Sequence, residues 1–241
     1  MNTQSLFKKK NAAPRCSAVI VAAGASARMG FDKIMTPLGG EPVLARTLAA
    51  FQANELIDEI IVVTRMEMLG EVAELCKKYG VDKISKVVCG GKTRMESALA
   101  GVSEVRRGAK LIAIHDGARP LVTQDVILRA IYAANDHMSA VPVIKSTDTL
   151  KRVDDKGLVA GAVDRESVVR VQTPQVFSSD LIKGALTKAV TTKLALTDDC
   201  SAIEMMGVKT YTVMGDEDNI KLTNRRDLFI AEAILRGRDE K

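Results

Sequence analysis

Short apolar segments alternate with longer amphipathic segments along most of this chain. The apolar segments are continuous runs rich in Val, Ile and Ala, a pattern typical of strands buried on both faces of a sheet. The segments between them space their apolar residues as helices do, with Val43, Leu44, Leu48 and Phe51 on one stripe of the first. The pattern predicts strands at residues 17–22, 59–64, 84–89, 110–115 and 140–144, and helices at about 42–53, 66–79, 93–105 and 123–135.

This alternation predicts an α/β fold with a doubly wound, mostly parallel, Rossmann-like sheet. Ligands of such sheets bind beyond the carboxyl ends of the strands. We therefore look for chemistry in the residues that directly follow each predicted strand.

The alternation is interrupted after residue 146. Two short strand-like segments, 147–153 and 157–163, flank the turn sequence Asp154-Asp155-Lys156-Gly157. They predict a projecting β-hairpin arm at about 146–165, and a hairpin with exposed edges commonly finds a partner chain. Helices are expected again at 179–190, 198–206 and 224–235, with a strand at 209–214. We expect a flexible leader over residues 1–15 and a single domain over residues 16–238.

Composition excludes several classes of function. The chain has 241 residues, 46% of them hydrophobic and only 3% aromatic, so aliphatic packing must hold the core and stacking platforms for single-stranded nucleic acid are not expected. The net charge of +5 is mild and no basic stripe for a duplex is present, so we expect no nucleic-acid partner. No signal peptide and no apolar stretch of membrane length occurs, and the four cysteines are widely spaced, so we expect a cytoplasmic protein with reduced thiols and no membrane association.

The segment after the first predicted strand carries the strongest chemical signal. Ala22-Ala23-Gly24 leaves the backbone N–H groups uncovered, and Arg28 and Lys33 add positive charge to the same loop. Bare N–H groups with nearby cations suit phosphates, so the loop indicates a nucleoside triphosphate. It is neither a Walker A loop nor a dinucleotide fingerprint. The structural alternative is a tight turn with two surface cations.

A second loop, Gly90-Gly91-Lys92-Thr93, follows the third predicted strand. Glycines allow close approach of a flat group such as a base, and Arg94 and Ser97 share one face of the next helix. The structural alternative is a capping box formed by Thr93 and Glu96.

Acidic and basic residues follow the later strands. Asp116 comes directly after a buried strand, where a carboxylate meets Mg²⁺ or a ribose hydroxyl, and Arg119 is spaced to pair with it. The structural alternative is a turn with an internal salt bridge. Asp198 and Asp199 suit a helix N-terminus, and Lys221 follows a turn from which it could reach the same cleft as Arg28 and Lys33.

Taken together, these segments resemble the 2-C-methyl-D-erythritol 4-phosphate cytidylyltransferases, within the sugar-phosphate nucleotidyltransferase superfamily. The resemblance covers roughly residues 16 to 236. It rests on AAGASARMG…K, GGKTRMES, HDGARP, STDTLKR, DR…TPQ, TDD-S and DNIKLT, which occur in the family's order.

The resemblance implies transfer of CMP from CTP to the sugar phosphate with Mg²⁺ as cofactor. Arg28 and Lys33 would stabilise the transition state, and Arg165 and Lys221 would position the acceptor. It also implies a homodimer in which Thr149 and Arg165 of the arm serve the active site of the other protomer. The remaining expected substrate-binding residues are Ala22, Ala23, Gly24, Gly91, Arg94, Ser97, Asp116, Arg119 and Thr173.

Three alternatives stay open on the residues alone. Ribitol-5-phosphate cytidylyltransferases share the fold, most motifs and the chemistry, and the pocket around Thr149, Arg165 and Thr173 would distinguish the two acceptors. A related enzyme could use UTP or GTP. A nucleotide-binding regulator could keep the fold without turnover, although the joint presence of Arg28, Lys33, Arg165 and Lys221 argues against it.

Overall fold

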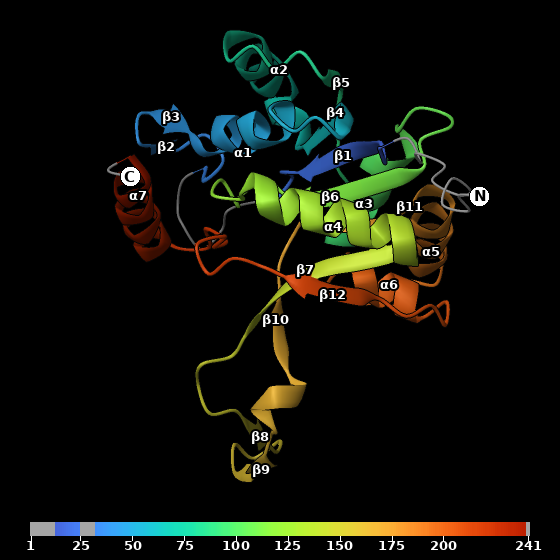
Figure 1. Ribbon diagram of the computed structural model, residues 1–241, viewed down its shortest axis with the longest axis vertical. Helices are drawn as coiled ribbons and strands as arrows, with labels where there is room; N and C mark the ends of the chain where they lie inside the picture. Colours follow the sequence, from blue (N-terminus) through green and yellow to red (C-terminus); the bar gives the residue numbers. More distant parts are fainter. Residues whose placement is uncertain (1–12, 25–31, 240–241) are drawn as a thin grey trace, which may run out of the picture.

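An eight-stranded mixed sheet forms the centre of the molecule (Figure 1). The computed structural model describes residues 13–24 and 32–239. The strand order is β10-β7-β11-β6-β1-β4-β5, with β12 also paired to β7. The strands of this sheet are β1 (Cys16–Val21), β4 (Ile57–Thr64), β5 (Ile84–Cys89), β6 (Leu111–Asp116), β7 (Ser139–Lys145), β10 (Val169–Val171), β11 (Gln175–Ser178) and β12 (Tyr211–Met214).

The middle of the sheet is parallel, as the sequence predicts. β1 pairs in parallel with both β4 and β6, and β4 pairs in parallel with β5. Their carboxyl ends therefore lie at one edge of the sheet, on either side of β1. The loops that the sequence analysis selected after the first, third and fourth predicted strands therefore all lie at this edge.

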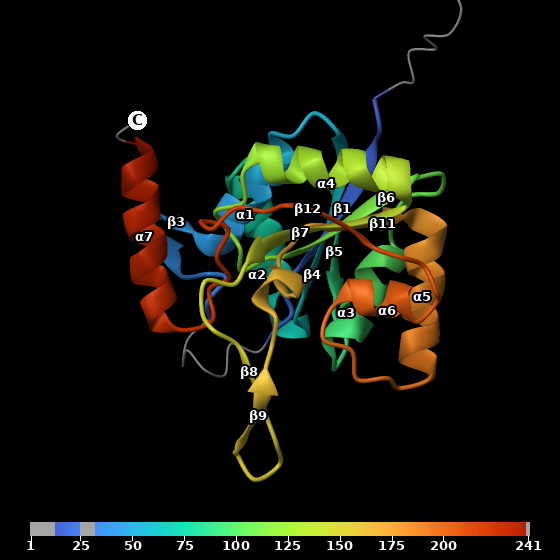
Figure 2. The same ribbon diagram turned by 60° about the horizontal axis from the view of Figure 1, so that its bottom comes forward.

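Helices cover both faces of the sheet. Alternate residues of β1 feed two separate cores: Ala18 and Ile20 pack in one, and Val19 packs in the other. The first core includes residues of α1 (Val43–Gln52), α2 (Leu69–Lys78) and α4 (Gln124–His137), and the second includes residues of α3 (Arg94–Ser103), α5 (Ser179–Thr191) and α6 (Asp199–Glu204). Figure 2 shows α4 on one side of the sheet and α3, α5 and α6 on the other.

The sequence pattern misses two strands of the central sheet and predicts one helix where the structure has a 3₁₀ turn and a helix. β11 lies antiparallel between β6 and β7, and β10 pairs antiparallel with β7. Both are short, and β11 begins with a polar residue just after Pro174, so neither has a visible period. The helix predicted over 66–79 is a 3₁₀ turn, Met66–Met68, followed by α2.

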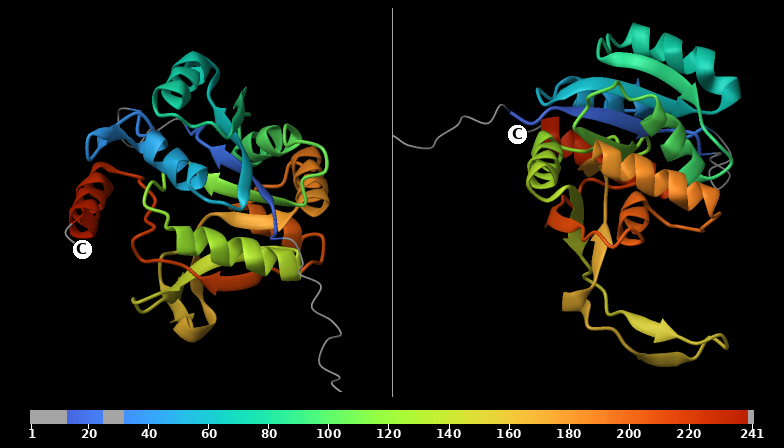
Figure 3. Two further views of the ribbon diagram at one scale, coloured as in Figure 1. Left: turned by 45° about the horizontal axis from the view of Figure 1, so that its top comes forward. Right: turned by 90° about the vertical axis from the view of Figure 1, so that its right-hand side faces the viewer.

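The predicted arm is a separate two-stranded sheet that extends away from the body (Figure 3). Its strands, β8 (Lys151–Val153) and β9 (Val159–Ala162), are shorter than the pattern predicts. The Asp154 carboxylate accepts hydrogen bonds from the backbone of Lys156 and Leu158, which closes the turn. Val153, Leu158 and Val159 are exposed, so the arm has an uncovered apolar surface.

The C-terminal segment packs against the start of the chain's first helical region. α7 (Arg225–Asp239) lies at one end of the molecule, next to the short strands β2 (Pro37–Leu38) and β3 (Glu41–Pro42) (Figure 1). Leu38, Val43, Leu222 and Ala231 form a small core there. This core fixes the segment that carries Lys221.

Among the residues that the structure describes, no helix is both long enough and apolar enough to cross a membrane. All four cysteines are free thiols, as expected. Of the leader predicted over residues 1–15, residues 1–12 lie outside the described part of the chain.

Candidate active site

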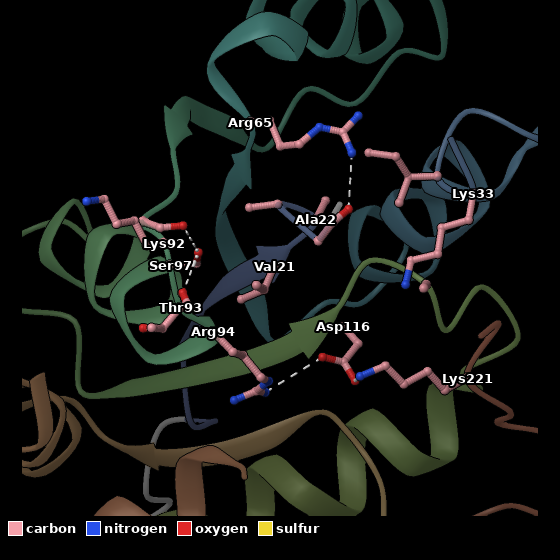
Figure 4. A pocket seen from close by; sticks show the side chains of 15 residues that line it. Val21, Ala22, Lys33, Arg65, Lys92, Thr93, Arg94, Ser97, Asp116 and Lys221 are labelled. Atoms are coloured by element: carbon pink, nitrogen blue, oxygen red, sulfur yellow. Dashed lines mark hydrogen bonds and ion pairs between the residues drawn. The ribbon is translucent and has the colours of Figure 1, made fainter. Parts of the chain in front are cut away.

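A pocket of about 460 Å³ lies at the carboxyl ends of the parallel strands (Figure 4). Its walls come from the residues that follow β1, β4, β5 and β6, together with Lys33 and the segment before α7. The lining residues are Val21, Ala22, Ala23, Gly24, Lys33, Ile34, Arg65, Gly91, Lys92, Thr93, Arg94, Ser97, Asp116, Ala118 and Lys221. Lys33 and Lys221 project into the pocket from the same side in Figure 4.

The loop between β5 and α3 is built by its glycines and by the capping box. The Thr93 hydroxyl accepts the Glu96 N–H at 3.1 Å, and Glu96 Oε2 accepts the N–H groups of Lys92 and Thr93 at 2.6 and 3.2 Å. A Cβ on Gly91 would lie 2.3 Å from the Glu96 Cβ, so a side chain there would displace the cap. The structural alternative is therefore confirmed, and the capped loop also lines the pocket.

Arg94 joins this helix start to α6. Its guanidinium donates two parallel hydrogen bonds to the fully buried Asp199 carboxylate, at 2.8 and 2.6 Å. Arg94 Nη2 also lies 3.7 Å from Asp116 Oδ1. Burial alone would lower the pKa of Arg94, but Asp199, together with Asp116 and Asp198, raises it by more, so the net direction is upward and the guanidinium is permanently charged.

Asp116 is surrounded by three cations. Lys221 Nζ lies 2.9 Å from its carboxylate, and Arg119 Nε and Arg94 Nη2 lie at 3.6 and 3.7 Å. Burial raises the pKa of Asp116, but Lys221 and then Arg94 and Arg119 more than reverse this, so its pKa falls well below the usual range. The predicted Asp116–Arg119 pair is present, and the pocket keeps an ionised carboxylate.

A buried hydrogen-bond chain holds Asp116 from behind. The Asp116 N–H donates to Thr173 Oγ1 at 3.1 Å, Thr173 lies 3.0 Å from His115 Nδ1, and His115 Nε2 lies 3.2 Å from the carbonyl of Arg119. A carbonyl only accepts, so Nε2 carries the proton and Nδ1 accepts from the Thr173 hydroxyl. Burial lowers the pKa of His115 to about 4, which keeps this ring neutral and structural.

Hydrogen bonds on both sides of Lys221 fix its backbone. Arg119 Nη1 donates to the carbonyl of Asn219 at 2.7 Å, and the Leu222 N–H donates to the carbonyl of Ala118 at 2.9 Å. The buried Asn219 side chain donates in turn to the carbonyl of Thr173 at 2.9 Å. These hydrogen bonds join the loop after β6 to the segment before α7, and Lys221 on that segment contacts Asp116.

Comparison with known proteins identifies the family of this chain. The model of the family "2-C-methyl-D-erythritol 4-phosphate cytidylyltransferase" matches residues 16–237. A curated relative of that name from Caldanaerobacter subterraneus subsp. tengcongensis is 42% identical over 223 residues, covering 91% of this chain and 98% of the relative. The chain belongs to the 2-C-methyl-D-erythritol 4-phosphate cytidylyltransferase family.

Solved structures agree with this membership. A 4-diphosphocytidyl-2C-methyl-D-erythritol synthase from Anaerococcus prevotii superposes with a TM-score of 0.83 at 32% identity, covering 92% of this chain and 96% of that one. A 2-C-methyl-D-erythritol 4-phosphate cytidylyltransferase from Thermus thermophilus has a TM-score of 0.75 at 30% identity, covering 90% and 98%. The predicted α/β cytidylyltransferase fold is confirmed.

Most of the residues that the cytidylyltransferase resemblance assigns to the substrates lie in one pocket. Of the expected transition-state and acceptor residues, Lys33 and Lys221 line it, and Arg28 lies outside the described residues. The expected binding residues that line it are Ala22, Ala23, Gly24, Gly91, Arg94, Ser97 and Asp116.

Four expected site residues lie elsewhere in this chain. Arg119 and Thr173 are behind Asp116, where they support it without lining the pocket. Thr149 and Arg165 belong to the arm, and Arg165 is exposed beside Glu166, with 3.7 Å between Nε and Oε1. Within a single cytidylyltransferase chain the arm does not complete the site.

The structure adds two residues that the sequence did not single out for the site. Asp199 was expected only to complement a helix dipole; Asp198 caps α6 through the Ser201 N–H, and Asp199 pairs with Arg94. Arg65 lines the pocket from the residue after β4. Asp199 lies 105 positions from Arg94, so no local spacing could have joined them.

Proposed function

We propose that this protein transfers CMP from CTP to 2-C-methyl-D-erythritol 4-phosphate and releases pyrophosphate, a step of non-mevalonate isoprenoid biosynthesis. The observation that carries the proposal is the pocket itself. It combines the backbone of residues 22–24 with the cations Lys33 and Lys221 at the carboxyl edge of the sheet. Membership of the family supplies the identity of the substrates.

The reaction requires electrostatic stabilisation and positioning rather than a strong base. A phosphate oxygen of the acceptor attacks the α-phosphorus of CTP, a new P–O bond forms, and the bond to the bridging oxygen of pyrophosphate breaks. The nucleophile is already an anion, so the barrier comes from bringing polyanions together and from charge on the five-coordinate phosphorus. Lys33, and by resemblance Arg28, would stabilise that charge, and Lys221 would orient the acceptor phosphate.

The loop before α3 would hold the nucleotide. Gly91, Thr93 and Ser97 line the pocket, and the Ser97 hydroxyl lies 2.9 Å from the carbonyl of Thr93. This part of the pocket is rigid because the capping box and the Arg94–Asp199 pair hold both sides of the helix start. Rigid backbone groups can form hydrogen bonds with the edge of one base and so distinguish it from the others.

The residues of the pocket fit a magnesium ion carried by the substrate. No cluster of three or more His, Cys, Asp or Glu side chains suited to a metal occurs within residues 13–24 and 32–239. Asp116 is the ionised carboxylate of the pocket, and Mg²⁺ commonly binds through one or two carboxylates together with substrate phosphates. The CTP phosphates would supply most of the ligands of the ion and Asp116 would add one carboxylate ligand, and the ion would neutralise charge on the triphosphate.

The arm supports a homodimer as the working unit. It extends away from its own pocket and exposes Val153, Leu158 and Val159, and its Arg165 has no place in that pocket. In the proposed dimer, Thr149 and Arg165 of each arm reach the other protomer's acceptor site.

The test is pyrophosphate release from CTP and Mg²⁺ with 2-C-methyl-D-erythritol 4-phosphate and ribitol 5-phosphate as separate acceptors. We expect release with the first acceptor and little with the second. A preference for ribitol 5-phosphate would keep the site and change the substrate, and tight CTP binding without release from either acceptor would contradict the enzymatic proposal.

A further inference from the structure

Arg65 contacts both described residues that flank residues 25–31. It directly follows β4, and its guanidinium enters the pocket opposite Asp116 and Lys221 (Figure 4). Arg65 Nη1 donates to the carbonyl of Gly24 at 3.2 Å, and Nη2 donates to the Asp32 carboxylate. A third contact, between Nε and Glu67 Oε1 at 2.9 Å, holds the guanidinium from the outer side.

The contacts of Arg65 with Gly24 and with Asp32 each involve a segment of the proposed CTP site. Gly24 ends the backbone stretch that follows β1, and Asp32 directly precedes Lys33. Asp32 also organises the turn that carries Lys33, because its Oδ1 accepts the Ile34 N–H at 3.1 Å and its carbonyl accepts the Thr36 hydroxyl at 2.8 Å. A shift of Asp32 would therefore shift Lys33.

We propose that Arg65 is a positioning residue that fixes Lys33 relative to the backbone at Gly24. This inference rests on the proposed function, because it concerns the position of Lys33 relative to the α-phosphate of CTP. Arg65 acts by bridging a carbonyl on one side and a carboxylate on the other, from a rigid position at the end of a buried central strand.

The chemistry of the side chain favours bridging over direct contact with the triphosphate. A guanidinium is a planar fork that can satisfy two acceptors at fixed geometry, whereas the Lys ammonium is a point charge on a flexible stem. Hydrogen bonds to Gly24 and Asp32 engage both terminal nitrogens of Arg65, and Nε forms an ion pair with Glu67 Oε1 at 2.9 Å without a hydrogen bond. Its side chain and that of Asp32 are also only 20% and 22% exposed, so solvent weakens their pairing little.

The experiment measures kcat and KM for CTP in wild-type protein and in Arg65→Ala, Arg65→Lys, Asp32→Asn and the double variant Arg65→Ala/Asp32→Asn. A displacement of about 1 Å in a positioned group costs on the order of 100-fold in rate. We expect Arg65→Ala and Asp32→Asn each to lower kcat by about 10- to 100-fold, with KM for CTP changed less than about threefold. Arg65→Lys should restore little of the lost kcat. The kcat of the double variant should lie within about threefold of that of Arg65→Ala, because both substitutions remove the same interaction.

Arg46→Ala is the matched control. Arg46 also bridges two acceptors near a turn, donating to the carbonyls of Leu38 and Gly39 at 2.5 and 2.8 Å, and it lies 3.6 Å from Glu41. Its side chain is 23% exposed, and it borders a different cavity. We expect its kcat to stay within about threefold of wild type, while thermal unfolding reports any general loss of stability in both variants.

Three results would overturn the inference. One is a rise in KM for CTP with unchanged kcat in Arg65→Ala and near-normal activity in Asp32→Asn, which would mean that Arg65 binds the triphosphate directly. The second is a double variant whose loss of kcat equals the product of the losses in Arg65→Ala and Asp32→Asn, which would mean that the two residues act independently. The third is normal kcat and KM in Arg65→Ala. Wild-type protein and Lys33→Ala in the same assay separate these results from failure of the proposed function: an inactive wild type contradicts the function, whereas an active wild type with an unaffected Arg65→Ala contradicts only the positioning role of Arg65.

Discussion

The buried chain behind Asp116 predicts a specific acid sensitivity of folding. His115 is fully buried and neutral, with its Nδ1 facing the Thr173 hydroxyl and its Nε2 facing a carbonyl. Its pKa falls from 6.5 to about 4 on folding. The unfolded chain therefore binds more protons than the folded chain below about pH 6.5, and the free energy of unfolding decreases as the pH falls through this window.

The magnitude follows from the two pKa values. Between about pH 7.5 and pH 5, a shift of the His115 pKa from 6.5 to about 4 removes about 2 kcal/mol from the free energy of unfolding. This is a large share of the roughly 5–15 kcal/mol that stabilises a typical domain. Asp116 has the opposite sign: its lowered pKa contributes stability above the unfolded value of 3.8, so its contribution is nearly constant over this range.

The assay is urea unfolding of wild-type protein and His115→Gln at both pH values. The Gln side chain carries no titrating proton, so most other pH effects cancel in the comparison. We expect the wild type to lose about 2 kcal/mol more than the variant on acidification. Equal losses in the two proteins would refute the assignment of a buried neutral imidazole at this position.

Three further predictions concern the site. Lys33→Ala should lower kcat by about 100- to 1,000-fold, the cost of removing one preorganised charge donor, in a steady-state assay of pyrophosphate release; turnover within threefold of wild type would exclude its role. Asp199→Asn should lower the free energy of unfolding by about 3–5 kcal/mol, because the Arg94 guanidinium loses its buried partner, and urea unfolding with a change below about 1 kcal/mol would contradict this. Arg165→Ala should raise KM for the sugar phosphate much more than KM for CTP. A mixture of Arg165→Ala and Lys33→Ala chains should recover activity, because in a mixed dimer one site combines Lys33 of one chain with Arg165 of the other. No recovery would contradict an arm that serves the other protomer's site.

The position of the pocket could be predicted from the sequence because parallel strands are visible as continuous apolar runs. Once β1, β4, β5 and β6 are recognised, their carboxyl ends must lie at one edge of the sheet. Gly24 and Gly91 follow β1 and β5, and Asp116 is the last residue of β6. The capping box at Thr93 was equally visible, because it depends on residues only three apart.

Long-range pairing could not be predicted in the same way. The partner of Arg94 depends on how α6 packs after β11 has entered the sheet antiparallel, and β11 is too short to show a period. Nothing in the sequence distinguishes Arg65 from any other cation that follows a strand, because its two acceptors come from residues far away in the sequence. The chemistry of a residue could be inferred from its type, but its partner required the fold.

The central claim is that the acceptor attacks the α-phosphorus of CTP. The most direct test follows a radioactive phosphate of CTP into the products of the reaction. The protein is incubated with Mg²⁺, 2-C-methyl-D-erythritol 4-phosphate and CTP labelled with ³²P at either the α- or the γ-phosphate. Attack on the α-phosphorus predicts that the α-label moves into the sugar product and the γ-label into pyrophosphate, in equal amounts, and that both transfers are about 100- to 1,000-fold slower in Lys33→Ala. Transfer of the γ-label to the sugar, or release of orthophosphate, would contradict the account.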